Sequence, residues 1–77
     1  MMKFRNEFVL RSFAQQMKKV RLEKGISQEE LAYSSGLSLS QIARIETAKV
    51  NPTLCTIFVI AKYLKIHPKE LLDFKLE

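Results

Sequence analysis

The 77-residue chain contains one cysteine and one histidine, and this shortage restricts the chemistry open to it. Cys55 has no second cysteine to pair with, so the chain is not expected to be a disulfide-stabilised secreted miniprotein. Cys55 and His67 together fall short of the roughly three or four ligands that a zinc site needs. We therefore expect neither a metal site nor a redox role, and interpret Cys55 as a small hydrophobic residue.

Long apolar runs and glycine-rich loops are also missing. No apolar run approaches the ~20 residues of a membrane-spanning helix, and the first residues lack the apolar core and cleavage site of a signal peptide. No glycine-rich loop is present to hold a phosphate, and the adjacent Glu29 and Glu30 suit a helix start better than acid–base catalysis. We therefore predict a cytoplasmic protein that is not an enzyme, binds no cofactor or small molecule, and has no membrane partner.

The chain does have an excess of positive charge. It contains 13 lysine and arginine residues against 8 acidic residues, which gives a formal net charge of +5. Residues 1–24 contribute +5, residues 25–48 contribute −2, and residues 49–77 contribute +2. Such an excess favours an anionic partner such as nucleic acid, although it says nothing about the fold.

Two glycines and two prolines divide the chain into segments with helical character. Apolar residues three and four positions apart predict a first helix from about Phe8 to Lys24, which Gly25 can end in a left-handed conformation. Each later helix is predicted to begin after a residue that can cap it; these residues are Ser27, Ser38, Thr53 and His67. We predict one all-α domain of five helices, residues 1–77, in which residues 1–12 form an N-terminal extension.

The segment 28–47 has the spacing of two short helices that cross at a steep angle. Ala32 is small where the helices must approach closely, and Gly36 can adopt the positive φ that a tight turn requires. Ile42 can then fill the space between the helices, and the remaining buried residues are expected to be Leu31, Leu37 and Ile45. A helix pair of this kind can serve only as core, but its two capped starts and flanking helices favour DNA binding.

The sequence here resembles the phage-repressor-like, Cro/XRE-type helix-turn-helix family, from about Phe13 to Leu72. The matching motifs are Ile26-Ser27-Gln28-Glu29-Glu30-Leu31-Ala32, Gly36-Leu37-Ser38, Ile42-Ala43-Arg44-Ile45-Glu46 and Asn51-Pro52-Thr53-Leu54. The resemblance implies a compact five-helix, lambda-repressor-like domain that binds operator DNA, usually as a dimer, and regulates transcription. It also implies that the third helix enters the major groove while the second lies across the DNA backbone.

The resemblance implies roles for individual residues. The base-contacting positions fall on Ser38, Leu39, Ser40, Gln41 and Arg44, and the phosphate-contacting positions fall on Gln28, Lys49 and Asn51. Arg44 suits a guanine, Gln41 could address an adenine, and Leu39 could pack on a thymine methyl group. Leu39 departs from the polar or basic residue that is common at its position. Fewer side chains are therefore available to recognise bases by direct hydrogen bonds.

Two further positions carry structural expectations from the same resemblance. Arg21 and Glu46 match positions that often form an ion pair between the first and third helices, although Arg21 could also contact a phosphate. Ala48 replaces a glycine that often follows the third helix. We expect Ala48 either to adopt a left-handed conformation, at a cost of roughly 1 kcal/mol, or to lie in a longer third helix.

The fourth helix is predicted to be apolar on nearly all sides. Its core face is expected to comprise Leu54, Ile57, Ile60, Ala61 and Leu64. A helix that is apolar all round is normally buried on both faces, so we predict a homodimer interface. Its predicted residues are Cys55, Phe58, Val59, Tyr63, Phe74 and Leu76. The alternative is that the chain ends, including Phe4, Phe8, Val9 and Leu10, cover this face within one monomer.

Two functional hypotheses follow. The first is a sequence-specific transcriptional regulator that binds a (pseudo)palindromic operator in double-stranded DNA as a homodimer. The second is a protein-interaction module, such as an antitoxin that neutralises a partner protein, which keeps the fold but binds another protein. Binding to DNA through several phosphates must weaken steeply as salt concentration rises, so salt dependence separates the two hypotheses.

Overall fold

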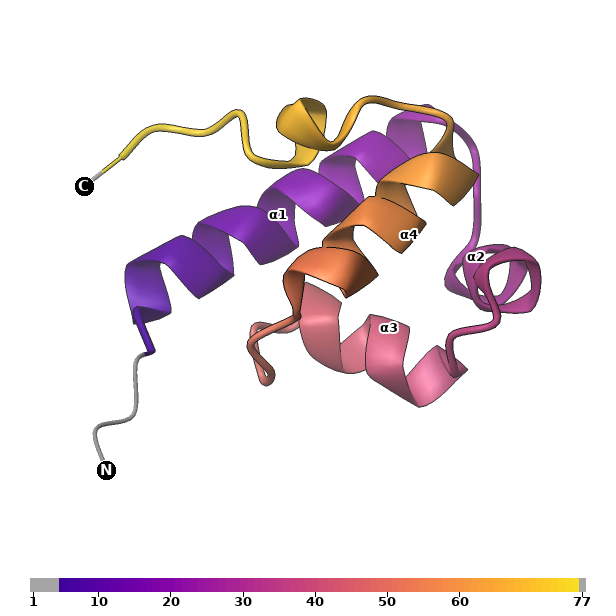
Figure 1. Cartoon of the computed structure of the whole chain (residues 1–77), viewed down its shortest axis with the longest axis horizontal. Coiled ribbons are helices and arrows are strands. Elements are labelled where there is room, and N and C mark those ends of the chain that lie inside the picture. Colours follow the sequence, from indigo (N-terminus) through magenta and orange to yellow (C-terminus); the bar gives the residue numbers. More distant parts are fainter. Residues whose placement is uncertain (1–4, 77) are drawn as a thin grey trace.

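The computed structural model describes residues 5–76 and contains four α-helices and one short 3₁₀ helix. The elements are α1 (Glu7–Glu23), α2 (Gln28–Ser35), α3 (Leu39–Glu46), α4 (Leu54–Leu64) and η1 (Pro68–Leu71). Figure 1 shows α1 as the long helix, with α4 and the α2–α3 pair on one side of it and the C-terminal segment running along the other. The all-α prediction is therefore confirmed, with no strand among residues 5–76.

The prediction of a fifth α-helix is wrong. His67 caps the last helical segment as expected, with its Nδ1 accepting from the Lys69 N–H at 3.0 Å, but only the 3₁₀ turn of η1 forms. The Gln16 side chain donates to the Glu70 carbonyl at 2.8 Å, and Phe74 N–H bonds instead to the Leu72 carbonyl. A longer α-helix would need that Glu70 carbonyl for the residue four positions later.

The helices begin where the sequence predicts capping. Ser27 Oγ accepts from Glu30 N–H at 3.0 Å while the Glu30 carboxylate accepts from Ser27 N–H at 3.0 Å. Ser38 and Gln41 form the same reciprocal pair at the start of α3. Each box satisfies two backbone donors that a helix start leaves without intrahelical partners. Asn6 caps α1, so that half of the predicted extension 1–12 belongs to this helix, and residues 1–4 lie outside the described part.

The helices end at residues with positive φ. Gly25 and Gly36 have φ values of 69° and 79°, as their positions predict. Ala48 has a φ of 58°, so the left-handed alternative holds and α3 ends at Glu46. The Ala48 methyl group is buried against Leu10 and Ala14, and this packing offsets part of the conformational cost.

Lys65 ends α4 with a φ of 60° and has no such compensation, because its side chain is exposed. Lys65→Gly is expected to raise the free energy of unfolding by about 1 kcal/mol, since glycine removes the left-handed strain. Chemical denaturation measures this change. Lys62→Gly is the matched control within α4, and it should instead lower stability by about 1 kcal/mol. A lower stability for Lys65→Gly would contradict the described end of α4.

The core lies between α1 and the four shorter elements. Its fully buried large side chains are Met17, Leu31, Ile42, Ile60, Leu64 and Leu71. On α4, the predicted inner face is correct for Ile57, Ile60, Ala61 and Leu64 but wrong for Leu54, which is 66% exposed. The reason is that only the later turns of α4 enter the core, while its first turn projects into solvent.

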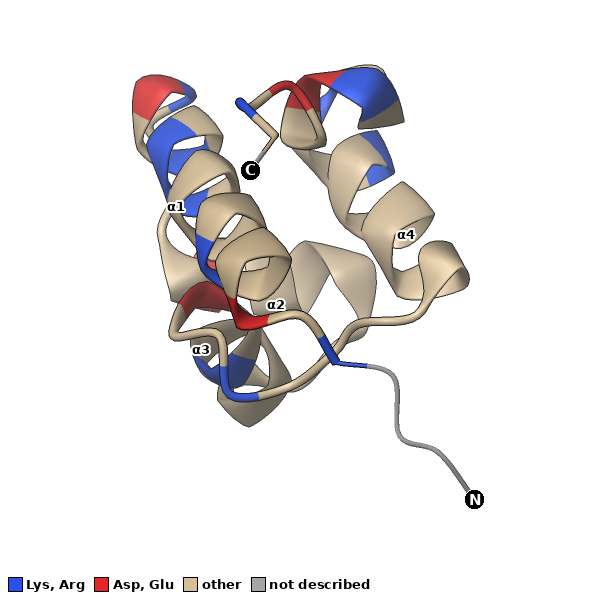
Figure 2. Cartoon of the chain, turned by 90° about the vertical axis from the view of Figure 1, so that its left-hand side faces the viewer, with Lys and Arg blue, Asp and Glu red and all other residues tan. Residues whose placement is uncertain are grey.

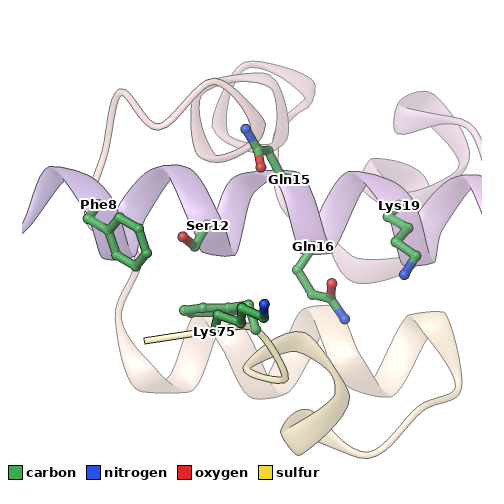
Figure 3. Close-up of a pocket in the computed structure, with 7 residues that line it drawn as sticks. Phe8, Ser12, Gln15, Gln16, Lys19 and Lys75 are labelled. Atoms are coloured by element: carbon green, nitrogen blue, oxygen red, sulfur yellow. The ribbon is translucent and has the colours of Figure 1, made fainter. Parts of the chain in front are cut away.

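The C-terminal segment lies along α1 within the same chain. Leu71 is fully buried, and Phe74 packs against the core as a half-buried residue. A shallow hollow of about 320 Å³ separates the segment from α1, and Figure 3 shows Phe8, Ser12 and Gln16 of α1 facing Lys75 across it. The C-terminal end therefore covers part of α1 rather than the outer face of α4.

Candidate nucleic-acid interface

The side chains predicted to contact bases lie together on the outer face of α3. Ile42 and Ile45 point into the core at 0% and 3% exposure, and this fixes which side of the helix faces solvent. The residues left on the surface are Ser38, Leu39, Ser40, Gln41 and Arg44. Leu39 is 44% exposed although it is apolar, so a large aliphatic side chain is presented at the start of the helix.

Two of these side chains are held by the helix cap. Gln41 Oε1 accepts from the Ser38 N–H at 3.1 Å, and Ser38 Oγ accepts from the Gln41 N–H at 3.0 Å. The Gln41 oxygen therefore faces the backbone, while its NH₂ group remains available to donate. The start of α3 is thus ordered before any partner binds.

The loop between α3 and α4 extends the same surface. Lys49 is exposed next to the left-handed Ala48, and its backbone N–H donates to the Arg44 carbonyl at 2.9 Å. Arg44, Asn51 and Gln41 help to line a hollow of about 200 Å³ between this loop and α3. The structure therefore brings two predicted phosphate-contacting positions beside two predicted base-contacting ones.

A buried ion pair joins α1 to the end of α3. Arg21 Nε lies 2.6 Å from Glu46 Oε2, and Arg21 Nη2 donates to Glu46 Oε1 at 2.9 Å. The side chains are only 7% and 2% exposed, and Arg21 Nη1 also donates to the Ile26 carbonyl at 2.8 Å. The hydrogen bonding of Arg21 to the Glu46 carboxylate, to which it donates, raises the pKa of Arg21 against the opposing effect of burial. All three guanidinium nitrogens therefore have partners inside the protein, which leaves Arg21 little capacity to hold a phosphate.

Gln28 joins the same network at the start of α2. Its Nε2 donates to Glu46 Oε1 at 3.0 Å, and its side chain is half-buried. Glu46 thus links residues of α1, α2 and α3, which fixes the angle between the two helices of the helix-turn-helix. A primary amide has two N–H donors, so a Gln28 held in this way still has one donor for an anion.

Sequence patterns did not identify Arg5 as a partner of this surface. Its Nη2 donates to the Ala48 carbonyl at 2.8 Å, across 43 positions of sequence, and it also pairs with Glu7. Arg5 therefore fixes the start of α1 to the loop that carries Lys49. No periodicity or motif indicates such a contact, because it depends on how the chain returns to α1.

Charge and apolar surface are separated on the molecule. Figure 2 shows lysine and arginine residues along one side of α1, while α4 has no charge before its last turn. Leu54, Cys55 and Phe58 line an open apolar hollow on α4, and Leu54 and Phe58 are more than half exposed. Of the other predicted interface residues, Leu76 is exposed, whereas Val59, Tyr63 and Phe74 are half-buried.

Other kinds of site find no support among the described residues. No group of three or more histidine, cysteine and acidic side chains within residues 5–76 is arranged to hold a metal ion. None of the helices in that range is long and apolar enough to cross a membrane.

Comparisons with known proteins agree with this geometry. A helix-turn-helix family model matches residues 17–71. The control protein C.BamHI of Bacillus amyloliquefaciens is 41% identical over 63 residues, which cover 80% of this chain and 78% of that protein. The solved restriction-modification controller protein C.AhdI of Aeromonas hydrophila is 40% identical, with a TM-score of 0.78 over 80% of this chain and 94% of its own.

A third relative was solved with DNA. The restriction-modification controller protein C.Esp1396I, as a tetramer in complex with its natural 35 base-pair operator, is 36% identical with a TM-score of 0.76. The match covers 88% of this chain and all of that one. With its α2–α3 geometry and these relatives, the chain belongs to the Cro/XRE-type helix-turn-helix family of transcriptional regulators.

Proposed function

We propose that the chain is a sequence-specific double-stranded-DNA-binding regulator that inserts α3 into the major groove. The observation that carries this proposal is the exposed, capped start of α3, which presents Leu39, Gln41 and Arg44 from a helix fixed by Ile42 and Ile45. An α-helix fits the major groove, where each base pair has a distinct pattern of donors and acceptors. No catalytic step and no cofactor are part of the proposal.

The residues around α3 are proposed to hold the DNA backbone. Gln28 at the start of α2 and Lys49 and Asn51 after α3 flank the base-contacting residues on both sides. Contacts of this kind set the position of a protein on the duplex, while the base contacts select the sequence. Replacement of Lys49 should therefore weaken binding to all DNA sequences alike. Replacement of Arg44 should weaken binding to the operator only.

The binding unit is proposed to be a homodimer on a (pseudo)palindromic operator. The apolar hollow formed by Leu54, Cys55 and Phe58 lies on α4, and none of these three residues is among the proposed DNA contacts. A second copy that covers this face would bury its exposed apolar surface and place two α3 helices for two half-sites. The tetrameric complex of C.Esp1396I is compatible with two such dimers on one operator.

Phe58→Glu is expected to shift the protein towards the monomer, because a carboxylate in an apolar interface would lose its hydration. Sedimentation equilibrium at micromolar concentration measures the shift. Tyr33→Glu is the matched control, since Tyr33 is 90% exposed on α2 and lies outside the proposed interface. A parent protein that sediments as a monomer at all concentrations would contradict the dimer.

The relatives also indicate a biological role. Because C.AhdI and C.Esp1396I are restriction-modification controller proteins, we propose that the chain controls transcription at such a locus. A gel-shift competition among genomic fragments, repeated at two salt concentrations, tests this proposal. The fragment upstream of the chain's own reading frame, or of a neighbouring restriction or methyltransferase gene, should compete best.

The exposed apolar face of α4 also fits the alternative of a protein-interaction module. The same competition separates the two functions. If no fragment competes better than bulk DNA, the result supports the protein-interaction module and contradicts the sequence-specific regulator.

A further inference from the structure

The hydrogen-bonding character of α3 is set by the way its first turn is capped. The Ser38 backbone N–H can only donate, so the atom of the Gln41 amide that faces it at 3.1 Å must be the oxygen. The Gln41 NH₂ group is therefore the part that points away from the cap. Ser38 Oγ is likewise occupied as an acceptor, by the Gln41 N–H at 3.0 Å, and its hydroxyl hydrogen is left to donate.

The other exposed polar groups on this face are mainly donors too. Arg44 has five N–H groups and no acceptor. Glu46, the only carboxylate of α3, is buried in the pair with Arg21 and cannot reach a base. Ser40 is the one exposed side chain whose oxygen is not engaged in the cap, and Leu39 offers only methyl groups. The surface is thus rich in donors and poor in acceptors.

In the major groove, some bases present mainly acceptors to a protein and others present an amino donor. Guanine presents two acceptors, N7 and O6, and thymine presents the O4 acceptor beside its methyl group. Cytosine presents the N4 amino donor, and adenine presents the N6 amino donor next to an N7 acceptor like that of guanine, so the keto or amino group and not N7 separates the two classes of base. A donor that faces an amino group gains no hydrogen bond and loses its contact with water.

We propose that α3 selects keto bases, guanine and thymine, on the DNA strand that it contacts, and that Gln41 enforces this choice by donating through its capped amide. The selection rests on the proposed function. This proposal replaces the expectation that Gln41 pairs with adenine. That pairing needs the amide oxygen to accept from adenine N6 while the amide nitrogen donates to N7 of the same base. The capped oxygen is turned to the backbone of Ser38 instead.

A single substitution can reverse this chemistry without loss of the cap. In Gln41→Glu, a carboxylate oxygen replaces the amide oxygen as the acceptor of the Ser38 N–H. Glu30 accepts from the Ser27 N–H in the same way at the start of α2. Gln41→Glu replaces the outward NH₂ donor by an acceptor oxygen. Glu30→Gln is the mirror-image control, since it makes the reverse swap in a box of the same geometry outside α3.

Selection of binding sites from randomised duplexes, followed by sequencing, tests the proposal on the parent, Gln41→Glu and Glu30→Gln. The parent and Glu30→Gln should enrich guanine or thymine at the base that faces Gln41. Gln41→Glu should enrich cytosine or adenine there and bind the parent's site about 10- to 100-fold more weakly. Melting temperatures of all three proteins verify that they are folded at the temperature of selection.

Two results would overturn the selection of keto bases by Gln41. One is a parent protein whose selected sites carry cytosine or adenine at the position that Gln41→Glu alters. The other is a Gln41→Glu protein that selects the same bases as the parent at every position. A parent that enriches no sequence would overturn the proposed function itself, and this selection with it.

Discussion

Glu46→Ala is expected to lower the free energy of unfolding by about 3–5 kcal/mol, because it leaves the Arg21 guanidinium buried without its counter-ion. Arg21 is 5% exposed, so solvent cannot replace the lost carboxylate. The substitution also removes the acceptor of the Gln28 amide. A domain of this size has a total stability of roughly 4–12 kcal/mol, so the loss is a large share of it.

Thermal and chemical denaturation measure the effect of Glu46→Ala. The matched control is Glu23→Ala, which removes an exposed glutamate from α1 and should change stability by less than about 0.5 kcal/mol. Glu46→Gln should lie between the two, because it retains the size of the side chain and one acceptor oxygen. Equal melting temperatures for Glu46→Ala and the parent would refute the structural role of the ion pair.

Arg44→Ala is expected to weaken binding to the operator by about 30-fold or more and to leave stability nearly unchanged. A bidentate contact between arginine and guanine contributes about 1–3 kcal/mol, and a dimer loses it in both half-sites. Arg44 is exposed on α3, so its removal leaves no cavity in the core. Arg44→Lys should also bind weakly, because lysine keeps the charge but lacks the planar pair of donors.

Titration of labelled operator, monitored by fluorescence anisotropy, measures these affinities. Lys75→Ala is the control for charge, since Lys75 lies beside α1 on the C-terminal segment (Figure 3), in a hollow lined by no residue of α3. It should alter affinity for operator and for mixed-sequence DNA equally. If Arg44→Ala behaved like Lys75→Ala, a base-specific role for Arg44 would be excluded.

Local features of the structure are well predicted by the sequence. The two capping boxes depend on residues three positions apart, and the turns at Gly25 and Gly36 depend on single glycines. The burial of Ile42 follows from its spacing after Ala32 and Gly36. Each of these features is set by neighbours along the chain, so one sequence without relatives is enough to predict it.

The wrong or missing predictions involve partners far apart in sequence. The fifth α-helix fails to form where Gln16 takes the carbonyl of Glu70, 54 positions away. Leu54 belongs to the apolar periodicity of α4, yet the angle at which α4 crosses the core leaves it exposed. Periodicity states which residues share a face, but it does not state how much of that face the neighbouring elements cover.

The candidate site shows the same division. The positions on α3 follow from the resemblance to a family, and the structure places all of them on one exposed face. The contact of Gln28 with Glu46 and that of Arg5 with Ala48 depend on the final packing of the helices. The contact of Gln28 changes the expected chemistry, because only part of its amide is left for the proposed contact with the DNA backbone.

The ratio of two affinities tests most directly whether the chain is a sequence-specific DNA-binding protein. The affinities are those for the best-competing genomic fragment and for mixed-sequence DNA of equal length, measured at the same ionic strength. Specific regulators bind their sites at least about 10³-fold more tightly than other DNA, and we expect a ratio of this size. A ratio near one would contradict sequence-specific DNA binding by this chain.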